Sequence, residues 1–489
     1  MRFRVPRWPL ISLLAVMAVV SACSSRRPPP VVFDAPTTTA PPSDPVDIPA
    51  LIHRGCYACL ERALTEARRR DDLQLVFEIA ALLTLRAKEL GLPHQEWLDL
   101  ASGAAADDRR RAGLLEIAAA IPPDPLSGVR DAPGAGARLQ SAAVNEWLEG
   151  LPAAPGSRPF RMYLELALRC SAGGPPAKPD TAIPGELQDV PLIRYRLGIC
   201  GNAYADHLRE VRAADPEFVD VDYALGRYAQ QLTPYPDLDG AVRLLQSSAR
   251  AFPRSSAIAT SLGDVYGTIE EWNDAVRAYD AALALVEGHP EAQRGRLVAL
   301  SSLGQHEAAI DAATRMMQGQ WYLGEAYYWR AWNHLQLGNL EAARADRGRM
   351  KTLRLNSRVY LLSGLIDWRL GQLEAAEVEF EESLSMDFGQ CDAATFLGGV
   401  RNARGRSREA LDAFTHAVQC NDLEITLRRE RIRTVETSDA PEAYKLREIA
   451  RHERGIEQAA RRRDEAAYGV DVLRKYLTSI QAPQSPQRR

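Results

Sequence analysis

The sequence has little excess charge of either sign, no long apolar run and no stretch of alternating polar and apolar residues. Its 489 residues carry 60 basic and 64 acidic side chains, which gives a formal net charge of −4. Near-neutral charge argues against a bulk nucleic-acid binder, which needs a strongly basic face. The absence of strand-like alternation predicts an all-α protein. A hydrophobic fraction of 46% is enough to form a core.

The sequence also lacks the common catalytic motifs. It contains no Gly-Lys-Ser/Thr phosphate loop, no Gly-x-Ser-x-Gly elbow and no His-Glu-x-x-His pair. Its eight histidines are scattered, and none is paired with another four residues away. We therefore expect no catalysis, no cofactor, no metal and no small-molecule substrate. The alternative is an enzyme with an unrecognised active site in residues 50–185.

The N-terminus has the charge and length of a secretory leader. Arg2, Arg4 and Arg7 precede an uncharged apolar run over residues 8–20. This run is shorter than the ~20 residues that a membrane-spanning helix needs. It is followed by the sequence Val-Ser-Ala-Cys ending at Cys23, which resembles the lipobox of bacterial lipoproteins.

That resemblance implies that residues 1–22 are removed and that Cys23 carries lipid. Two acyl chains make a stable anchor, because each buried methylene contributes ~0.8 kcal/mol and one chain alone is marginal. Ser24 stands where the inner-membrane retention signal has Asp, which implies an outer-membrane anchor facing the periplasm if the organism has two membranes. An ordinary signal peptide is the alternative. We expect residues 23–49 to form a disordered tether, since eight prolines leave little apolar surface to bury.

From about residue 219 onward the sequence repeats itself with a period near 34. The glycines that close a recurrent motif, Gly304, Gly338, Gly371 and Gly405, are spaced by 34, 33 and 34 residues. Small and aromatic residues also recur at matching offsets in two segments: Leu262-Gly263, Tyr266, Ala275, Tyr279 and Ala282, and Leu397-Gly398, Ala410, Phe414 and Ala417. This pattern resembles the tetratricopeptide repeat.

The resemblance implies a stack of antiparallel helix pairs, because no single pair can bury its apolar faces alone. We expect an array over residues 186–422, with six clear units at about 219–255, 256–289, 290–323, 324–356, 357–390 and 391–422. A weaker seventh unit ends near Pro216. Two units depart from the pattern. The 290 unit has Arg296-Leu297 in place of Leu-Gly, and the 324 unit has Arg347 where an aromatic residue is usual.

The regions on either side of the array are also predicted to be helical. The segment from Leu73 to Leu90 is interpreted as an amphipathic helix, and further helical stretches are expected at about 107–120, 135–149 and 158–170. We interpret residues 50–185 as divergent helical hairpins that continue the solenoid, with a separate helical domain as the alternative. Residues 423–480 are predicted to form capping helices, and residues 481–489 a disordered tail.

Six cysteines remain after Cys23. Sequence proximity favours three disulfides: Cys391 with Cys420, Cys170 with Cys200, and Cys56 with Cys59. Cys391 opens the first helix of its unit and Cys420 closes the second, and those two ends lie side by side in an antiparallel pair. Export to an oxidising compartment makes oxidation plausible. The alternative is that some of the six stay free and buried as small hydrophobic residues.

The resemblance places a protein-binding groove on the first helices of the units. Carried over by position, it is lined by residues of the 324 and 357 units: Tyr328, Trp329, Trp332, Gln336, Arg358, Leu361, Trp368 and Arg369. Aromatic residues and Arg most often anchor interfaces, although large aromatics also fill the space between repeats. We expect a membrane-anchored, exported scaffold that binds protein partners in the cell envelope. A structural subunit of an envelope complex is the alternative.

Overall fold

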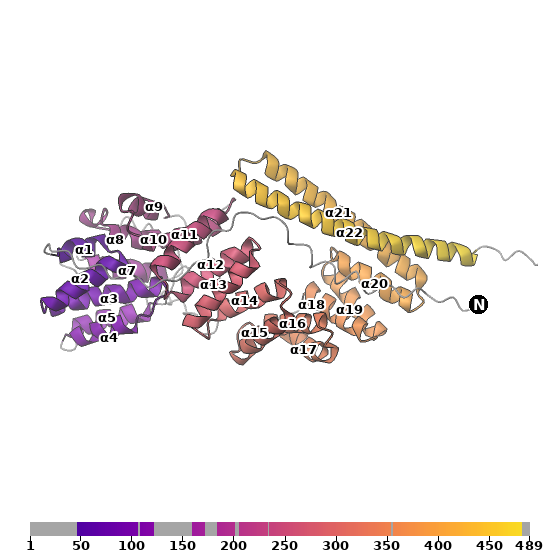
Figure 1. Cartoon of the computed structure of the whole chain (residues 1–489), viewed down its shortest axis with the longest axis horizontal. Coiled ribbons are helices and arrows are strands. Elements are labelled where there is room, and N and C mark those ends of the chain that lie inside the picture. Colours follow the sequence, from indigo (N-terminus) through magenta and orange to yellow (C-terminus); the bar gives the residue numbers. More distant parts are fainter. Residues whose placement is uncertain are drawn as a thin grey trace, which may run out of the picture.

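The computed structural model describes residues 46–105, 108–121, 159–171, 183–200, 205–232, 234–353 and 356–481. All regular elements within these ranges are helices, as the composition and periodicity predict. Figure 1 shows an N-terminal lobe, an arc of helix pairs and a long C-terminal hairpin. The leader, Cys23, the predicted tether up to residue 45, the helix predicted at 135–149 and residues 482–489 lie outside the described residues. The predicted tether boundary at residue 49 is too late, because Ile48 and Pro49 already belong to the first helix, α1 (Ile48–Arg54).

Six helix pairs follow one another where the six clear units are expected. They are α10 (Asp220–Gln231) and α11 (Leu238–Ala251), α12 (Ser256–Thr268) and α13 (Trp272–Leu285), α14 (Pro290–Ser302) and α15 (His306–Gln318), α16 (Leu323–Gln336) and α17 (Leu340–Leu353), α18 (Ser357–Arg369) and α19 (Leu373–Met386), and α20 (Cys391–Ala403) with the start of α21 (Ser407–Thr437). The four periodic glycines follow the first helices with φ between 71° and 78°. Glycine adopts this left-handed conformation without the steric cost that other residues meet.

Within a unit, the glycine of the first helix makes room for a ring from the second helix. A Cβ atom at Gly263 would lie 2.6 Å from Cε1 of Tyr279, and one at Gly364 would lie 2.6 Å from Cε1 of Phe380. Real Cβ atoms do not approach so closely, so the two helices can be this near only because the glycine has no side chain.

The two departing units reach the same packing by other means. In the 290 unit the large and small residues are exchanged, because Leu297 occupies the glycine position, Ala313 occupies the aromatic position, and both are fully buried. In the 324 unit, Arg347 pairs instead with the buried carboxylate of Asp367 in the next unit. The missing aromatic ring is thus replaced by an ion pair between repeats.

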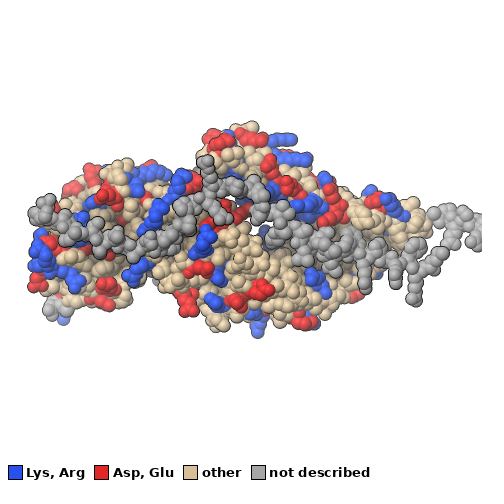
Figure 2. All heavy atoms as spheres, viewed as in Figure 1, with Lys and Arg blue, Asp and Glu red and all other residues tan. Residues whose placement is uncertain are grey.

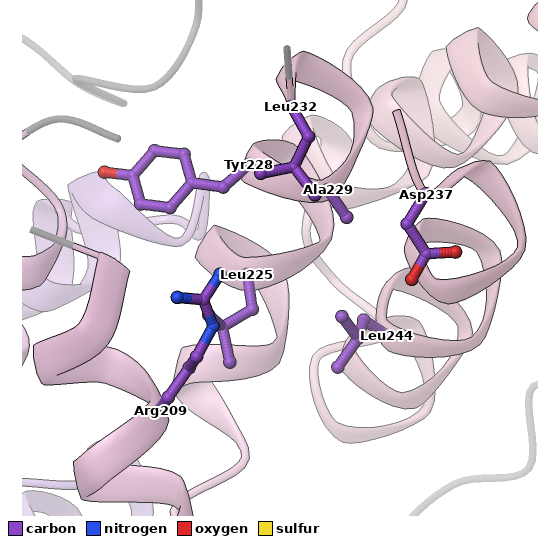
Figure 3. A pocket seen from close by; sticks show the side chains of 7 residues that line it. All are labelled: Arg209, Leu225, Tyr228, Ala229, Leu232, Asp237 and Leu244. Carbon is purple, nitrogen blue, oxygen red and sulfur yellow. The ribbon is translucent and has the colours of Figure 1, made fainter. Parts of the chain in front are cut away.

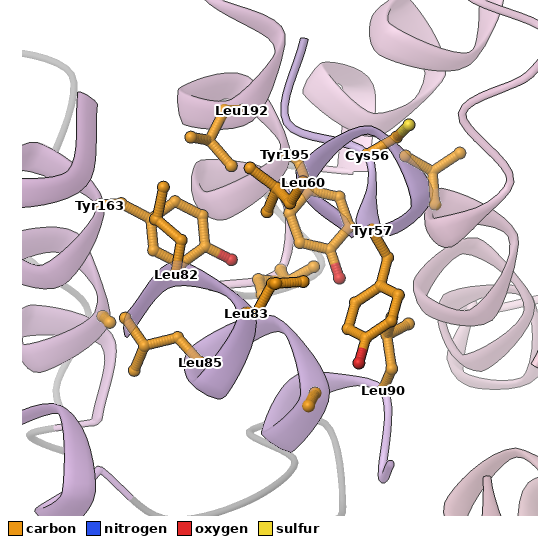
Figure 4. Close-up of a cluster of buried hydrophobic side chains, with 14 of the residues drawn as sticks. Cys56, Tyr57, Leu60, Leu82, Leu83, Leu85, Leu90, Tyr163, Leu192 and Tyr195 are labelled. Atoms are coloured by element: carbon orange, nitrogen blue, oxygen red, sulfur yellow. The ribbon is translucent and has the colours of Figure 1, made fainter. Parts of the chain in front are cut away.

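The N-terminal lobe is built around α3 (Leu73–Glu89). Helices α1 (Ile48–Arg54), α2 (Tyr57–Arg69), α4 (Gln95–Ala105), α5 (Arg109–Ala120), α7 (Pro159–Ser171), α8 (Pro191–Gly198) and α9 (Ala205–Ala214) complete it. The prediction that the Leu73–Leu90 segment is amphipathic is wrong, because every residue of α3 from Ile79 to Glu89 is buried. Figure 4 shows leucines and tyrosines converging on this helix from several neighbours.

The lobe shares one continuous hydrophobic core with the first repeats, which extends from Ile48 to Ala278. The ring of Tyr57 packs edge-on against Phe252 with centroids 6.0 Å apart, and the Ser255 hydroxyl donates to the carbonyl of Leu90. Residues 50–185 are therefore not separated from the array by a core of their own. Nor do they simply continue a solenoid, because α3 is buried on every side from Ile79 to Glu89.

Charged groups inside this core neutralise one another. The guanidinium of Arg86 is fully buried, donates to Glu89 at 3.0 Å and to Asp220, and stacks 3.6 Å from the ring centroid of Tyr195. Arg196 donates to the other oxygen of Glu89 at 2.8 Å. Burial raises the pKa of Asp220, while the charge of Arg86 opposes this rise. Asp220 also begins α10, so this network joins the lobe to the first repeat.

Lys88, between Arg86 and Glu89 on α3, is not part of this network and has backbone partners instead. Its ammonium donates to the carbonyls of Ala118, Ala119 and Ile121 at 2.7 to 3.1 Å. These groups end α5 and would otherwise lack partners, so the lysine caps that helix. Burial lowers the pKa of Lys88 to about 8.

The C-terminal part is a helical hairpin of two long helices. The predicted boundary at residue 422 has no counterpart, because α21 continues without a break from the last repeat to Thr437. The chain then turns, and α22 (Glu442–Gln481) runs back along α21. In Figure 1 this hairpin extends from α20 back to the level of α11.

We expect Arg86→Leu to lower the free energy of unfolding by about 3–5 kcal/mol, because it leaves two carboxylates buried with their main cation removed. Arg243→Leu on the exposed side of α11 is the control and should change the value by less than about 0.5 kcal/mol. Urea unfolding followed by circular dichroism measures both. Equal effects of the two changes would contradict the role given to the buried network.

Candidate functional site

The first helices of the repeats form a continuous face. Helix α12 contacts α14, and the contacts continue from α14 to α16, from α16 to α18 and from α18 to α20. In Figure 1, α14 and α16 lie on the side of the arc that is nearer the hairpin. We call the residues predicted for binding on α16 and α18 the first-helix face: Tyr328, Trp329, Trp332, Gln336, Arg358, Leu361, Trp368 and Arg369.

The aromatic members of this face are half-buried between repeats. Trp329 packs against the core shared by the 290 and 324 units, and Trp332 against the core shared by the 324 and 357 units. The indole of Trp368 lies 5.3 Å from the ring of Phe396 on α20, measured between centroids. Each ring therefore fills space between repeats and also keeps an accessible part.

The charged residues of this face are more exposed to solvent. Arg358 and Arg369 are exposed at the two ends of α18, whereas Leu361 and Gln336 are partly buried. Burial raises the pKa of the Tyr328 phenol on α16, and the charge of the Arg358 guanidinium on α18 lowers it in part. The face thus combines partly accessible aromatic residues with exposed guanidinium groups.

A buried polar cluster beside this face was missed by sequence reasoning. The amide of Asn333 is fully buried and donates to Ser301 Oγ and to the Trp329 carbonyl, both at 2.7 Å. Its Oδ1 lies 2.8 Å from Nδ1 of His306. An asparagine in the middle of a periodic helix, 32 residues after a serine, is the only sequence signal for it. The cluster sets the register of α16 against α14 and α15.

With this geometry established, the chain can be compared with known families. The family model described as a tetratricopeptide repeat matches residues 357–389, which form α18 and α19. The unit formed by α18 and α19 is thus a tetratricopeptide repeat, and the stacked helix pairs have this type of fold. No curated protein matches the chain.

Three solved structures are similar to part of the chain. YrrB, described as a tetratricopeptide-repeat protein with an unusual peptide-binding site, is 18% identical over 36% of this chain and 91% of its own, with a TM-score of 0.32. PilW, a type IV pilus biogenesis factor, is 19% identical over 42% and 96%, with a TM-score of 0.35. A tetratricopeptide-repeat protein from Parabacteroides merdae is 15% identical over 53% and 90%, with a TM-score of 0.31.

The structure brings the six cysteines together in the three expected pairs. The Cα atoms are 4.9 Å apart for Cys56 and Cys59, 5.3 Å for Cys170 and Cys200, and 5.5 Å for Cys391 and Cys420. These separations lie within the range of disulfides. The last pair joins the start of α20 to α21 at the point where the hairpin leaves the repeat array.

A small pocket lies outside the first-helix face, between α9, α10 and α11 (Figure 3). Its volume is about 170 Å³, enough for one apolar side chain. Leu225, Leu232 and Leu244 line it, and Arg209 and Asp237 stand at its edge. Sequence reasoning gave no sign of it, because these residues come from three different helices.

The titratable groups of the N-terminal lobe favour a structural role. Arg86, Glu89, Arg196 and Asp220 are buried and are engaged with one another, and the pocket described above is lined from α9 onward. Within the described part of the chain, no three His, Cys, Asp or Glu side chains are grouped as metal ligands would be.

Charged side chains of both signs are mixed on the surface. Figure 2 shows acidic and basic side chains interspersed over the visible face of the described residues. None of the helices in the described ranges combines the length and the apolar character that crossing a membrane requires.

We expect mass spectrometry of unreduced peptides to show Cys391 joined to Cys420, because their Cα separation needs no backbone movement. The experiment uses protein isolated from its native compartment and digested without a reductant. Reduction before digestion is the control and should release both peptides. Alkylation of both cysteines in the unreduced sample would contradict the pairing.

Proposed function

We propose that this chain is an exported, lipid-anchored scaffold that binds a protein partner through the first-helix face of its repeats. The observation that carries the proposal is the combination on that face of exposed guanidinium groups, Arg358 and Arg369, with the accessible edges of Trp332 and Trp368. Aromatic and Arg side chains supply most of the binding free energy at interfaces. Side chains held between two repeats are also well ordered before binding, which lowers the entropy cost of association.

The anchoring part of the proposal depends on the N-terminal sequence. A basic segment, a short apolar run and a cysteine after small residues are typical of a lipoprotein leader. Pairing of the remaining six cysteines is consistent with an oxidising compartment. We place the anchor in the outer membrane facing the periplasm if the organism has two membranes. The proline-rich tether would hold the repeats away from the lipid surface.

A structural subunit of an envelope complex is the second candidate. One observation favours it. Near its C-terminal end, α22 exposes Val472, Tyr476 and Ile480, which are 41%, 52% and 59% accessible and are spaced by four residues along one side of the helix. Such a stripe would be covered in a permanent assembly. It lies at the far end of the hairpin from the turn near α11, so the two functions would use different surfaces.

We expect photo-reactive p-benzoylphenylalanine at Arg358 or Arg369 to cross-link one and the same partner in intact cells. The matched control is Arg349, which is exposed on the second helix α17 and should capture nothing of that mass. Cross-linked species are separated by electrophoresis and identified by mass spectrometry. Equal capture from Arg349, or none from either α18 site, would contradict the assignment of the face.

We expect Cys23→Ala to move the protein from the membrane fraction to the soluble fraction, because the thiol that carries the lipid is lost. Ser24→Ala is the control and should leave the protein in the membrane fraction. Fractionation followed by immunoblotting measures the distribution. Retention of the Cys23→Ala protein in the membrane fraction would contradict the lipoprotein assignment.

A further inference from the structure

The hairpin is attached firmly at its base. Phe414 of α21 shares a hydrophobic cluster with Ala466 and Leu473 of α22, and Arg462 reaches Asp392 of α20 at 3.2 Å. The Cys391–Cys420 pair lies at the same level and ties α21 to the first helix of its unit. Asp392 belongs to a first helix, so α22 approaches the array from the side of the first-helix face.

The far end of the hairpin, which we call the tip, returns to the opposite end of the array. The hydroxyl of Tyr235, between α10 and α11, donates to Asp439 at 2.9 Å, and its ring lies 5.2 Å from that of Tyr444. Two ion pairs complete the contact: Arg447 with Asp239 at 2.7 Å, and Arg454 with Glu270 at 2.8 Å. These contacts connect residues about 200 positions apart in sequence, and the repeats from α14 to α19 lie between them along the chain.

The attachment at the tip is much weaker than the attachment at the base. From residue 426 to residue 454 the hairpin has a single buried residue, Ala440. Both ion pairs at the tip involve partly exposed side chains, and such pairs are screened by salt and contribute little net free energy. The tip is therefore a contact that can break while the base stays intact.

The free part of the hairpin is long enough for a small rotation to matter. The twelve residues of α21 from 426 to 437 span ~18 Å at ~1.5 Å per residue. A tilt of ~30° at the base would then carry the tip ~9 Å away from α11. The disulfide at the base limits twisting there and makes such a tilt the simplest movement.

We propose that the α21–α22 hairpin is a latch across the first-helix face, held shut by the contacts of Tyr235, Asp239 and Glu270 and opening to admit a protein partner. This proposal rests on the proposed function of that face. It assigns the tip as the releasable contact and the base, with its disulfide, as the hinge.

Distance measurement between two spin labels tests the opening in the full chain. The labels are attached through the ketone-bearing amino acid p-acetylphenylalanine at Arg243 on α11 and at Glu442 at the tip, so that the native cysteines stay paired. We expect one narrow distance in the parent. In Arg447→Glu with Arg454→Glu, the distribution should broaden and shift outward by ~9 Å, the displacement set by the length of the free hairpin.

The charge-swapped protein is the matched control. Adding Asp239→Arg and Glu270→Arg to the two hairpin changes restores opposite charges at both contacts, and the narrow distance should return. An unchanged distribution in the two-site variant would overturn the proposal, because the ion pairs of Asp239 and Glu270 would then not be what holds the latch shut. Failure of the swap to restore the distance would overturn the role of these ion pairs.

Cross-linking from p-benzoylphenylalanine at Arg358 tests whether the latch controls access. We expect the two-site variant to raise the yield several-fold over the parent, and the charge swap to reverse the gain. An unchanged yield beside a changed distance would overturn the latch and leave the proposed function standing. The absence of capture in every protein would overturn the proposed function and, with it, the partner that the latch admits.

Discussion

A helix pair in this protein cannot bury its apolar faces without a neighbour, and the rest of the structure depends on that constraint. The core of the array accordingly divides into small clusters, each formed where adjacent units meet. In an array built in this way, the first and the last unit each have an apolar face without a neighbouring repeat. The chain covers these two faces differently. At the N-terminal end, the lobe that is built around α3 packs against the first repeats. At the C-terminal end α22 covers the last repeat and then extends beyond it.

The buried charges follow from the same constraint. Stacking needs a defined register, and apolar contacts alone tolerate sliding because they lack direction. The Arg347–Asp367 pair, the Asn333 cluster and the Arg86 network each join one unit to its neighbour through groups that would be costly to leave unpaired. They therefore specify which residues meet. A solenoid with this many directional contacts between units presents its first-helix face in one arrangement, which the proposed binding of a partner requires.

Sequence reasoning located the repeats well because the period, the glycines and the aromatic residues are local signals. It failed at α3 for a physical reason. Arg86, Lys88 and Glu89 have the polarity of a solvated face, whereas the structure pairs them with Asp220, with the end of α5 and with Arg196, which are 30 or more residues away. The contacts of the hairpin tip could not be predicted for the same reason, because they join residues about 200 positions apart. The candidate binding residues could be assigned to their helices by position, but their half-buried state depends on neighbouring repeats that the pattern does not describe.

The contacts at the two ends of the hairpin also explain why the hairpin is longer than capping the last repeat requires. Covering the last repeat uses α22 only from about Ala459 to Leu473, where its buried residues lie. The remaining residues of the hairpin bury almost nothing, so core formation gives no reason for them to be helical and ordered. Their contacts are instead with Tyr235, Asp239 and Glu270 at the other end of the array. A segment that adds little stability yet contacts both ends of the array is better explained by the proposed control of the first-helix face than by capping.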